Sequence, residues 1–228
     1  MASRDTAEVG LASRLSVDVI ARHYQRHLPA HAKGRLLDLG CGKVPLFETY
    51  RGLVTSTFCV DWANTAHKNE HLDLECDLTR SLPFQDGEFD TILLSDVLEH
   101  IPTPELLCAE IARALAGSGK LIMNVPFFYW LHEEPHDYYR YTEFALRRFV
   151  ELAGLELVLI EATGGAPEIL ADMLAKLLAR VPVVGRVLSV AVQGMTGWFI
   201  GTRIGRRVSA ATSKKLPFGY FMVAIKRV

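Results

Sequence analysis

Four predicted strands of this 228-residue sequence end at a side chain that can accept hydrogen bonds from a ligand. They end at Asp38, at Asp61, at Asp77, and at Ser95 with Asp96. Because the carboxyl ends of parallel strands share one edge of a sheet, these groups should lie close together, at the edge where such sheets bind ligands. A carboxylate after the second strand suits ribose hydroxyls, and one after the third suits an adenine amino group. The spacing therefore predicts a cofactor that contains a nucleoside.

The turn after Asp38 narrows the choice of cofactor. In "LLDLGCGKVP", Gly40 and Gly42 flank Cys41 and let the backbone approach a ligand closely. A nicotinamide-binding turn has the pattern G-x-G-x-x-G, whose third glycine admits a helix close to the pyrophosphate. Here Pro45 occupies that third position. A cofactor without phosphates fits this turn better than a dinucleotide does.

Residues 125–144, "VPFFYWLHEEPHDYYRYTEF", combine aromatic rings with acid–base side chains. Aromatic walls with a few polar groups are typical of a ligand site, and the candidates for substrate contact are Tyr129, Trp130, Tyr138, Tyr139 and Arg140. His132 and His136 are the candidates for a general base near neutral pH, with Asp137 or Glu133 orienting one of them.

Three alternatives stand beside this interpretation of residues 125–144. In the first, the aromatic rings form only the core of a lid. In the second, Arg140 pairs with Glu133 or Glu134, whereas in the functional interpretation it binds a carboxylate or phosphate of the substrate. The two histidines would otherwise bind a metal ion, but Pro135 argues against one continuous helix that displays both. We therefore expect no metal site.

The hydrophobic pattern indicates how these residues are positioned. Helices are predicted over 14–28 (ended by Pro29), 47–52, 104–116 and 143–153, and strands over 34–40, 56–62, 71–78, 90–98, 120–126, 155–162 and 219–228. Strands that alternate with helices predict an α/β protein with a Rossmann-like, doubly wound, mainly parallel sheet of seven strands.

The region before the last strand has an unusual composition. From Lys176 to Lys215 it contains eight basic residues and no acidic one, which indicates an insertion of amphipathic helices. Its uncharged run, 187–202, is shorter than the ~20 residues of a membrane-spanning helix. Peripheral contact of 176–207 with an anionic membrane or a lipid-linked substrate is one interpretation. Packing across the active site or in a homodimer is the other.

The composition of the whole chain limits its partners. A net charge of −1 gives no field that would recruit nucleic acid. The four cysteines lack CxxC spacing, which favours reduced thiols, and the N-terminal "MASRDTAEVGLASR" lacks the apolar core of a signal peptide. We expect a cytoplasmic protein, either free or peripheral to the membrane.

Residues 33–162 resemble the class I S-adenosylmethionine-dependent methyltransferases of the type 11 group. The resemblance rests on "LLDLGCG", "VDW" and "LPFQDGEFD" followed by "DVLEHI". It implies an antiparallel last strand and a single domain, which we divide into an N-terminal helical segment (1–32), a cofactor-binding core (33–162), a helical insertion (163–215) and the last strand (216–228).

The resemblance also implies roles in binding S-adenosylmethionine. The methionine moiety would be surrounded by Asp38, Gly40, Cys41 and Gly42, and the ribose would be held by Asp61 beside Trp62. The adenine would lie between Asp77 and Leu78, and the Ser95 carbonyl would accept from the amino group. His100 would lie near the cofactor or the acceptor. "PHDYYRYT" resembles a subset of these enzymes associated with bacterial surface-saccharide and lipid-linked pathways.

The turn departs from the family at one position. Members commonly carry a third glycine where Val44 stands. We expect Val44 not to adopt the positive φ of a glycine, so that the turn has another shape and Lys43 points to solvent. The sequence thus predicts an S-adenosylmethionine-dependent methyltransferase that methylates an oxygen of a small molecule or a lipid-linked saccharide, with a histidine base. The alternative is a degenerate, non-enzymatic scaffold that acts through its basic, apolar tail.

Overall fold

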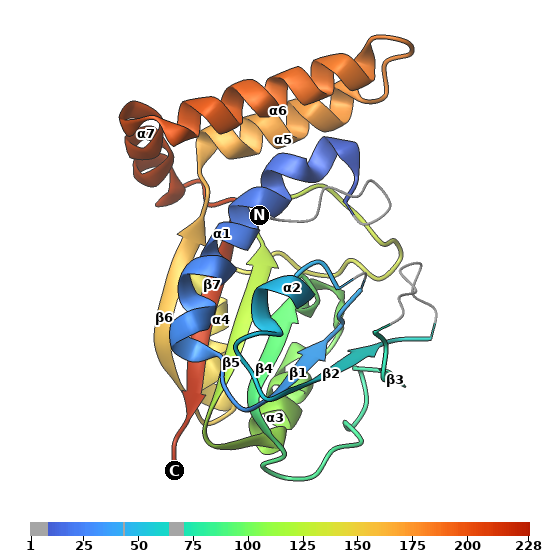
Figure 1. The fold of residues 1–228 in the computed structure, drawn as a ribbon, viewed down its shortest axis with the longest axis vertical. Helices are drawn as coiled ribbons and strands as arrows, with labels where there is room; N and C mark the ends of the chain where they lie inside the picture. Colours follow the sequence, from blue (N-terminus) through green and yellow to red (C-terminus); the bar gives the residue numbers. More distant parts are fainter. Residues whose placement is uncertain (1–8, 43, 64–70) are drawn as a thin grey trace. The chain divides into compact units, whose positions relative to one another are not determined.

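The structure, a computed structural model, describes residues 9–42, 44–63 and 71–228. The expectation for Lys43 falls outside the described residues. The helices are α1 (Arg14–His31), α2 (Phe47–Tyr50), α3 (Pro104–Ala114), α4 (Glu143–Leu152), α5 (Ala166–Leu178), α6 (Gly185–Gly201) and α7 (Arg203–Ser213), with 3₁₀ turns η1 (Leu11–Ser13) and η2 (Leu98–His100) (Figure 1). The strands are β1 (Arg35–Leu39), β2 (Ser56–Asp61), β3 (Leu74–Glu75), β4 (Phe89–Ser95), β5 (Leu115–Pro126), β6 (Leu155–Thr163) and β7 (Gly219–Lys226).

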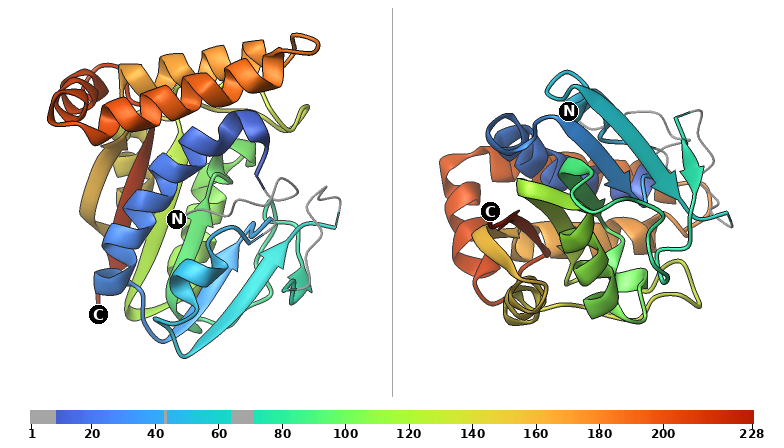
Figure 2. Two further views of the ribbon diagram at one scale, coloured as in Figure 1. Left: turned by 45° about the horizontal axis from the view of Figure 1, so that its top comes forward. Right: turned by 90° about the horizontal axis from the view of Figure 1, so that it is seen from below.

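The strands form one mixed sheet in the order β3-β2-β1-β4-β5-β7-β6. β1 pairs in parallel with β2 and β4, and β4 with β5, while β7 runs antiparallel (Figure 1). Consecutive apolar residues of β1 and β4 are buried because helices cover both faces, α1 on one and α3 and α4 on the other (Figure 2). The predicted fold class is confirmed.

The strand order places the carboxyl ends of β1, β2 and β4 at one edge. Asp38 pairs with Cys59 and Leu39 with Val60, so that Asp61 lies just beyond the end of β1. On the other side of β1, Asp38 pairs with Leu93, two residues before Ser95. The register therefore brings the predicted cofactor residues of three strands together.

Several elements differ in length from their predictions. β5 begins at Leu115 rather than at residue 120, α3 ends at Ala114 rather than at residue 116, and β4 ends at Ser95 rather than at residue 98. α1 continues past Pro29 to His31. Pro29 itself is exposed, whereas Leu28 before it is buried and its carbonyl accepts from Ala32 N at 2.8 Å. β3 contains only Leu74 and Glu75 of the predicted 71–78.

Side-chain hydrogen bonds add to the backbone bonds that flank β3, from Asp73 N to Cys59 O and from Cys76 N to Asp61 O. The Asp73 carboxylate accepts from Cys59 N and the Asp77 carboxylate from Thr79 N, so these backbone groups are satisfied without a longer strand.

The chain forms two compact units. One contains Met1–His23, Phe127–Trp130 and Ala162–Tyr220, and the other Tyr24–Pro126, Leu131–Glu161 and Phe221–Val228. The second contains most of the sheet. In the first, α5 and α6 lie side by side (Figure 2), and Leu15, Val19, Ala171 and Ile200 form a buried cluster. The predicted helical insertion is therefore α5–α7.

Candidate active site

The turn after β1 depends on glycine at two positions. Gly40 has φ of +71° and Gly42 of +52°, both in the left-handed region that favours glycine. The backbone N atoms of Gly40 and Cys41 donate to Val60 O at 2.8 and 3.0 Å, which ties the turn to β2. A Cβ on Gly42 would meet no described atom within 4 Å, so this side of the turn is open to a ligand.

Val44 contradicts the expectation for this turn. Its φ is 52°, so the prediction that it avoids the glycine region is wrong. The side chain is buried, and burial of its two methyl groups opposes a backbone cost of about 1–2 kcal/mol. Burial therefore holds a β-branched residue in a backbone conformation that favours glycine.

Asp38 is buried at the end of β1 and hydrogen-bonded to a residue that the sequence did not single out. The Tyr50 hydroxyl donates to Asp38 Oδ2 at 2.8 Å. Burial raises the pKa of Asp38 to about 6, although the bond from Tyr50 opposes part of that shift. Tyr50, on α2, is itself fully buried and fixes the orientation of the carboxylate.

Asp61 and Trp62 follow at the end of β2. Asp61 is buried, and its Oδ1 accepts from Trp62 N at 2.9 Å. The Trp62 ring is partly exposed and meets the His136 ring edge-on, with centroids 5.2 Å apart. His136 therefore lies beside the predicted ribose-binding strand end.

Asp77 and Leu78 lie beyond β3. Hydrogen bonds from Thr79 lower the pKa of the exposed Asp77, which also pairs with Arg80 at 3.2 Å. These contacts order the loop that follows β3. Leu78 is buried.

The end of β4 carries a further carboxylate, that of the half-buried Asp96. Asp96 has φ of 54° and accepts from Ser95 Oγ at 3.1 Å and from Asn124 Nδ2 at 2.7 Å. Burial raises the pKa of Asp96 to about 6, against the opposing effect of these two hydrogen bonds.

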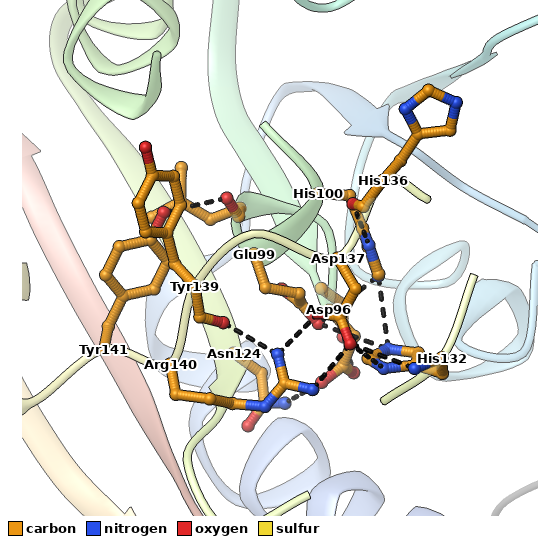
Figure 3. Close-up of polar contacts among 12 residues, drawn as sticks. Asp96, Glu99, His100, Asn124, His132, His136, Asp137, Tyr139, Arg140 and Tyr141 are labelled. Atoms are coloured by element: carbon orange, nitrogen blue, oxygen red, sulfur yellow. Dashed lines mark hydrogen bonds and ion pairs between the residues drawn. The ribbon is translucent and has the colours of Figure 1, made fainter. Parts of the chain in front are cut away.

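A second cluster joins η2 to the predicted substrate segment (Figure 3). His100 Nε2 lies 3.2 Å from His132 Nε2, and Glu99 Oε1 lies 3.8 Å from each of these nitrogens. Glu99 is fully buried, which raises its pKa well above the ordinary value, and nearby Asp96 adds to the shift. The structure thus brings His132 together with His100 rather than with His136, whose ring points away (Figure 3).

Asp137 contacts this cluster through His132. Its Oδ2 accepts from His132 N at 3.0 Å and lies 3.3 Å from His132 Nδ1. Arg140 donates to both carboxylate oxygens, from Nη1 at 2.6 Å and from Nη2 at 2.8 Å. Although burial acts to raise it, these hydrogen bonds lower the pKa of Asp137 to about 2. Arg140 therefore has a structural partner, as one alternative expected, but that partner is Asp137.

The aromatic candidates separate into two groups. Tyr138 and Tyr139 are exposed near η2, where both backbone N atoms donate to Glu99 O. Tyr129 and Trp130 belong to the other unit, where Lys176 Nζ lies 3.5 Å from the Tyr129 ring centroid and 5.0 Å from that of Trp130.

Sequence reasoning missed Tyr50, Glu99 and Asn124 as members of the site. The available signal was a charged residue inside the otherwise apolar "ILLSDVLEHI", since such a residue, if buried, needs a partner. Nothing in the sequence marks Tyr50 or Asn124 as polar partners of buried carboxylates.

Comparison with known proteins agrees with this geometry. Residues 37–123 match the family model described as "Methyltransferase domain". A protein of Methanocaldococcus jannaschii is 30% identical over 101 residues, which cover 44% of this chain and 47% of that protein. A ubiquinone biosynthesis O-methyltransferase of Burkholderia pseudomallei is 27% identical over 168 residues, 62% of this chain and 71% of that enzyme. The chain thus spans less than half of the archaeal relative's length.

The likeness extends to a solved structure. A SAM-dependent methyltransferase from Archaeoglobus fulgidus superimposes with a TM-score of 0.61 at 18% identity, over 93% of this chain and 94% of that one. At this identity the superposition shows the fold.

Proposed function

We propose that this chain, which belongs to the class I S-adenosylmethionine-dependent methyltransferases, methylates an oxygen of a small-molecule or saccharide acceptor. The observation that carries the proposal is the position of His136, an exposed base next to the strand end that carries Asp61. The name of the B. pseudomallei relative, an O-methyltransferase, supports an oxygen acceptor.

The residues at the ends of β1 and β2 fit the cofactor. The buried Asp38 carboxylate suits an ammonium group, the open side of Gly42 admits a ligand against the backbone, and Asp61 suits ribose hydroxyls. S-adenosylmethionine, when bound, supplies a sulfonium methyl group and departs as an uncharged thioether.

His136 is our candidate for the base. His132 has one ring nitrogen against His100 and the other beside Asp137, so both of its nitrogens have neighbours. His136 is exposed, and its Nδ1 lies 3.2 Å from the Tyr138 hydroxyl. It would remove the acceptor's proton as the new C–O bond forms, while His132 and Asp137 position the segment. Trp62, Tyr138 and Tyr139 would line the acceptor's path, and the main contribution to rate is positioning for in-line attack.

Calorimetry with S-adenosylmethionine and with its demethylated product tests the cofactor assignment. We expect binding of both, weakened at least tenfold in Asp61→Ala. Absence of binding at millimolar ligand, or undiminished binding to the variant, would contradict it.

Transfer of radiolabelled methyl groups tests the acceptor class. We expect the label to be transferred to an oxygen of some members of a panel of phenols and monosaccharides. We expect no transfer to the nitrogen of the matched anilines and amino sugars. His136→Gln should lower kcat by about 10²–10⁴-fold while binding of S-adenosylmethionine is unchanged. Labelling of the amines alone would overturn the oxygen assignment.

Exposed apolar side chains and basic residues in the unit with α5–α7 support contact with an anionic membrane surface. Large apolar side chains are exposed along α5 and α6, namely Leu170, Met173, Leu174, Leu177, Val187, Val190, Met195 and Trp198. Arginines Arg180, Arg186, Arg203, Arg206 and Arg207 flank them, and no acid occurs from Lys176 to Lys215. No helix among the described residues is long and apolar enough to cross a bilayer. We infer a protein of the cytoplasm that docks at the surface of an anionic bilayer through 176–207.

Sedimentation with vesicles tests this contact. We expect binding to phosphatidylcholine vesicles that contain phosphatidylglycerol and not to those without it. Trp198→Ser should reduce binding, and Phe144→Ser is the matched control because both side chains are 74% exposed. Binding to vesicles without binding of S-adenosylmethionine would favour the scaffold alternative. A protein that dimerises but does not bind vesicles would show that a second copy of the chain covers the apolar surface of α5 and α6.

A further inference from the structure

Glu99, His100 and His132 present three metal-ligand atoms to one point. The His100 and His132 Nε2 atoms are 3.2 Å apart, and each lies 3.8 Å from Glu99 Oε1. All three side chains are largely buried, with exposures of 13% for His100, 23% for His132 and 0% for Glu99. The atoms come from two segments of one unit, η2 and the loop before α4.

The second nitrogen of each ring is engaged in a way that directs Nε2 toward this point. His100 Nδ1 lies 2.9 Å from the backbone carbonyl of His136. Because a carbonyl only accepts, Nδ1 of His100 carries the hydrogen, and Nε2 of the neutral ring carries a lone pair. His132 Nδ1 faces the Asp137 carboxylate at 3.3 Å, which favours the same tautomer. Two lone pairs then face each other at 3.2 Å, and a cation bound by both nitrogens, a metal ion or a proton, would remove their repulsion.

Glu99 independently points to a cation. Among the described residues, neither of its carboxylate oxygens has a hydrogen-bond partner, although the side chain is fully buried. A buried carboxylate without hydrogen bonds is costly unless it is paired or bound to a metal. A cation held by the two histidines would meet this requirement.

The geometry points to a divalent transition-metal ion bound by Glu99, His100 and His132, with zinc as the best-matched ion. Ligand atoms at about 2.0–2.2 Å from a tetrahedral Zn²⁺ lie roughly 3.3–3.6 Å from one another, close to the observed separations. Imidazole ligands favour transition metals over Mg²⁺ or Ca²⁺. His100 and His132 already have the carbonyl and carboxylate neighbours that usually orient metal-bound histidines.

Three protein ligands leave one position of a tetrahedral ion open. This position suits a hydroxyl oxygen, whose proton is more readily lost when the oxygen is metal-bound. Resting on the proposed function, the ion would hold the acceptor oxygen and ease the loss of its proton to a base. The expectation of no metal site rested on the pair His132 and His136, whereas His132 lies beside His100 in the structure.

Metal binding is measured on the full chain, stripped with chelator and titrated with Zn²⁺ against a chromophoric competitor. We expect one equivalent per chain, at least 100-fold weaker in His132→Ala and in His100→Ala. Asp137→Asn should weaken it about 10–100-fold through the orientation of His132. His136→Ala is the matched control, because it removes a neighbouring histidine whose ring points away and should leave the affinity unchanged.

Cobalt provides a readout that needs no variant. Co²⁺ bound to the wild-type chain should show the intense visible bands of a tetrahedral site, and circular dichroism shows whether each variant is folded. Less than one equivalent of Zn²⁺, or equal affinity in the folded His132→Ala variant, would overturn the metal site and leave a proton shared by the histidines. Binding of S-adenosylmethionine is measured separately, so loss of the metal inference leaves the cofactor assignment intact.

Discussion

A Cβ atom on Gly40 would lie 2.4 Å from Val97 Cγ2, so the turn after β1 packs directly against the residue after Asp96. Gly40→Ala should destabilise the protein by about 2–4 kcal/mol, from the left-handed φ and from the overlap. Gly42→Ala shares the positive φ but meets no described atom within 4 Å, so about 1–2 kcal/mol is expected. Urea denaturation measures both. Equal losses would contradict the Val97 contact, and Val97→Ala should partly rescue Gly40→Ala.

Val44 should reverse the usual order of alanine and glycine variants. Both Val44→Ala and Val44→Gly lose the same buried methyl groups. At an ordinary site glycine is less stable than alanine by about 0.5–1 kcal/mol, but at φ of 52° alanine pays about 1–2 kcal/mol that glycine does not. Val44→Gly should therefore unfold at a urea concentration no lower than Val44→Ala. A less stable glycine variant would show that Val44 is not left-handed in solution.

Stability should fall with rising pH because of Asp38. Its pKa, raised by burial to about 6, exceeds the unfolded value of 3.8, so the folded state binds the proton more tightly. The stabilising contribution of this proton is complete below about pH 4 and is lost as the pH rises through 6, by up to about 3 kcal/mol. Relative to Asp38→Asn, the wild type should lose stability between pH 4 and 7 in urea titrations. Parallel profiles for the two proteins would contradict the buried, raised pKa.

Glu168 should stabilise the unit that contains α5–α7. Its carboxylate is buried and accepts from Gly165 N at 2.9 Å and from Ser209 Oγ at 2.6 Å, which joins α5 to α7. Glu168→Ala leaves both donors without this acceptor and should cost about 2–3 kcal/mol. Ser209→Ala removes one of the two bonds and should cost about 1 kcal/mol. Thermal unfolding compares them, and a smaller loss for Glu168→Ala than for Ser209→Ala would refute this role.

The sequence predicted most of the sheet, and the acids at the carboxyl ends of its strands, because both depend on local patterns. Apolar runs fixed β1, β2 and β4, and acids at their ends identified Asp38 and Asp61. It failed where distant packing decides the outcome. Val44 is held left-handed by burial, and β3 is shortened by carboxylates that capture backbone donors. His100 and His132 are 32 residues apart, and no periodicity indicates that their rings meet.

The Asp137 carboxylate serves the His132 backbone, the His132 ring and the Arg140 guanidinium together. Replacing either charged partner alone leaves the other charge largely enclosed without its counterpart. A substitution of Asp137 or Arg140 alone should therefore destabilise the protein more than a change of both residues together. Among relatives that share this loop, Asp137 and Arg140 should be inherited as one unit, retained or replaced together, and His132 should change only where they do.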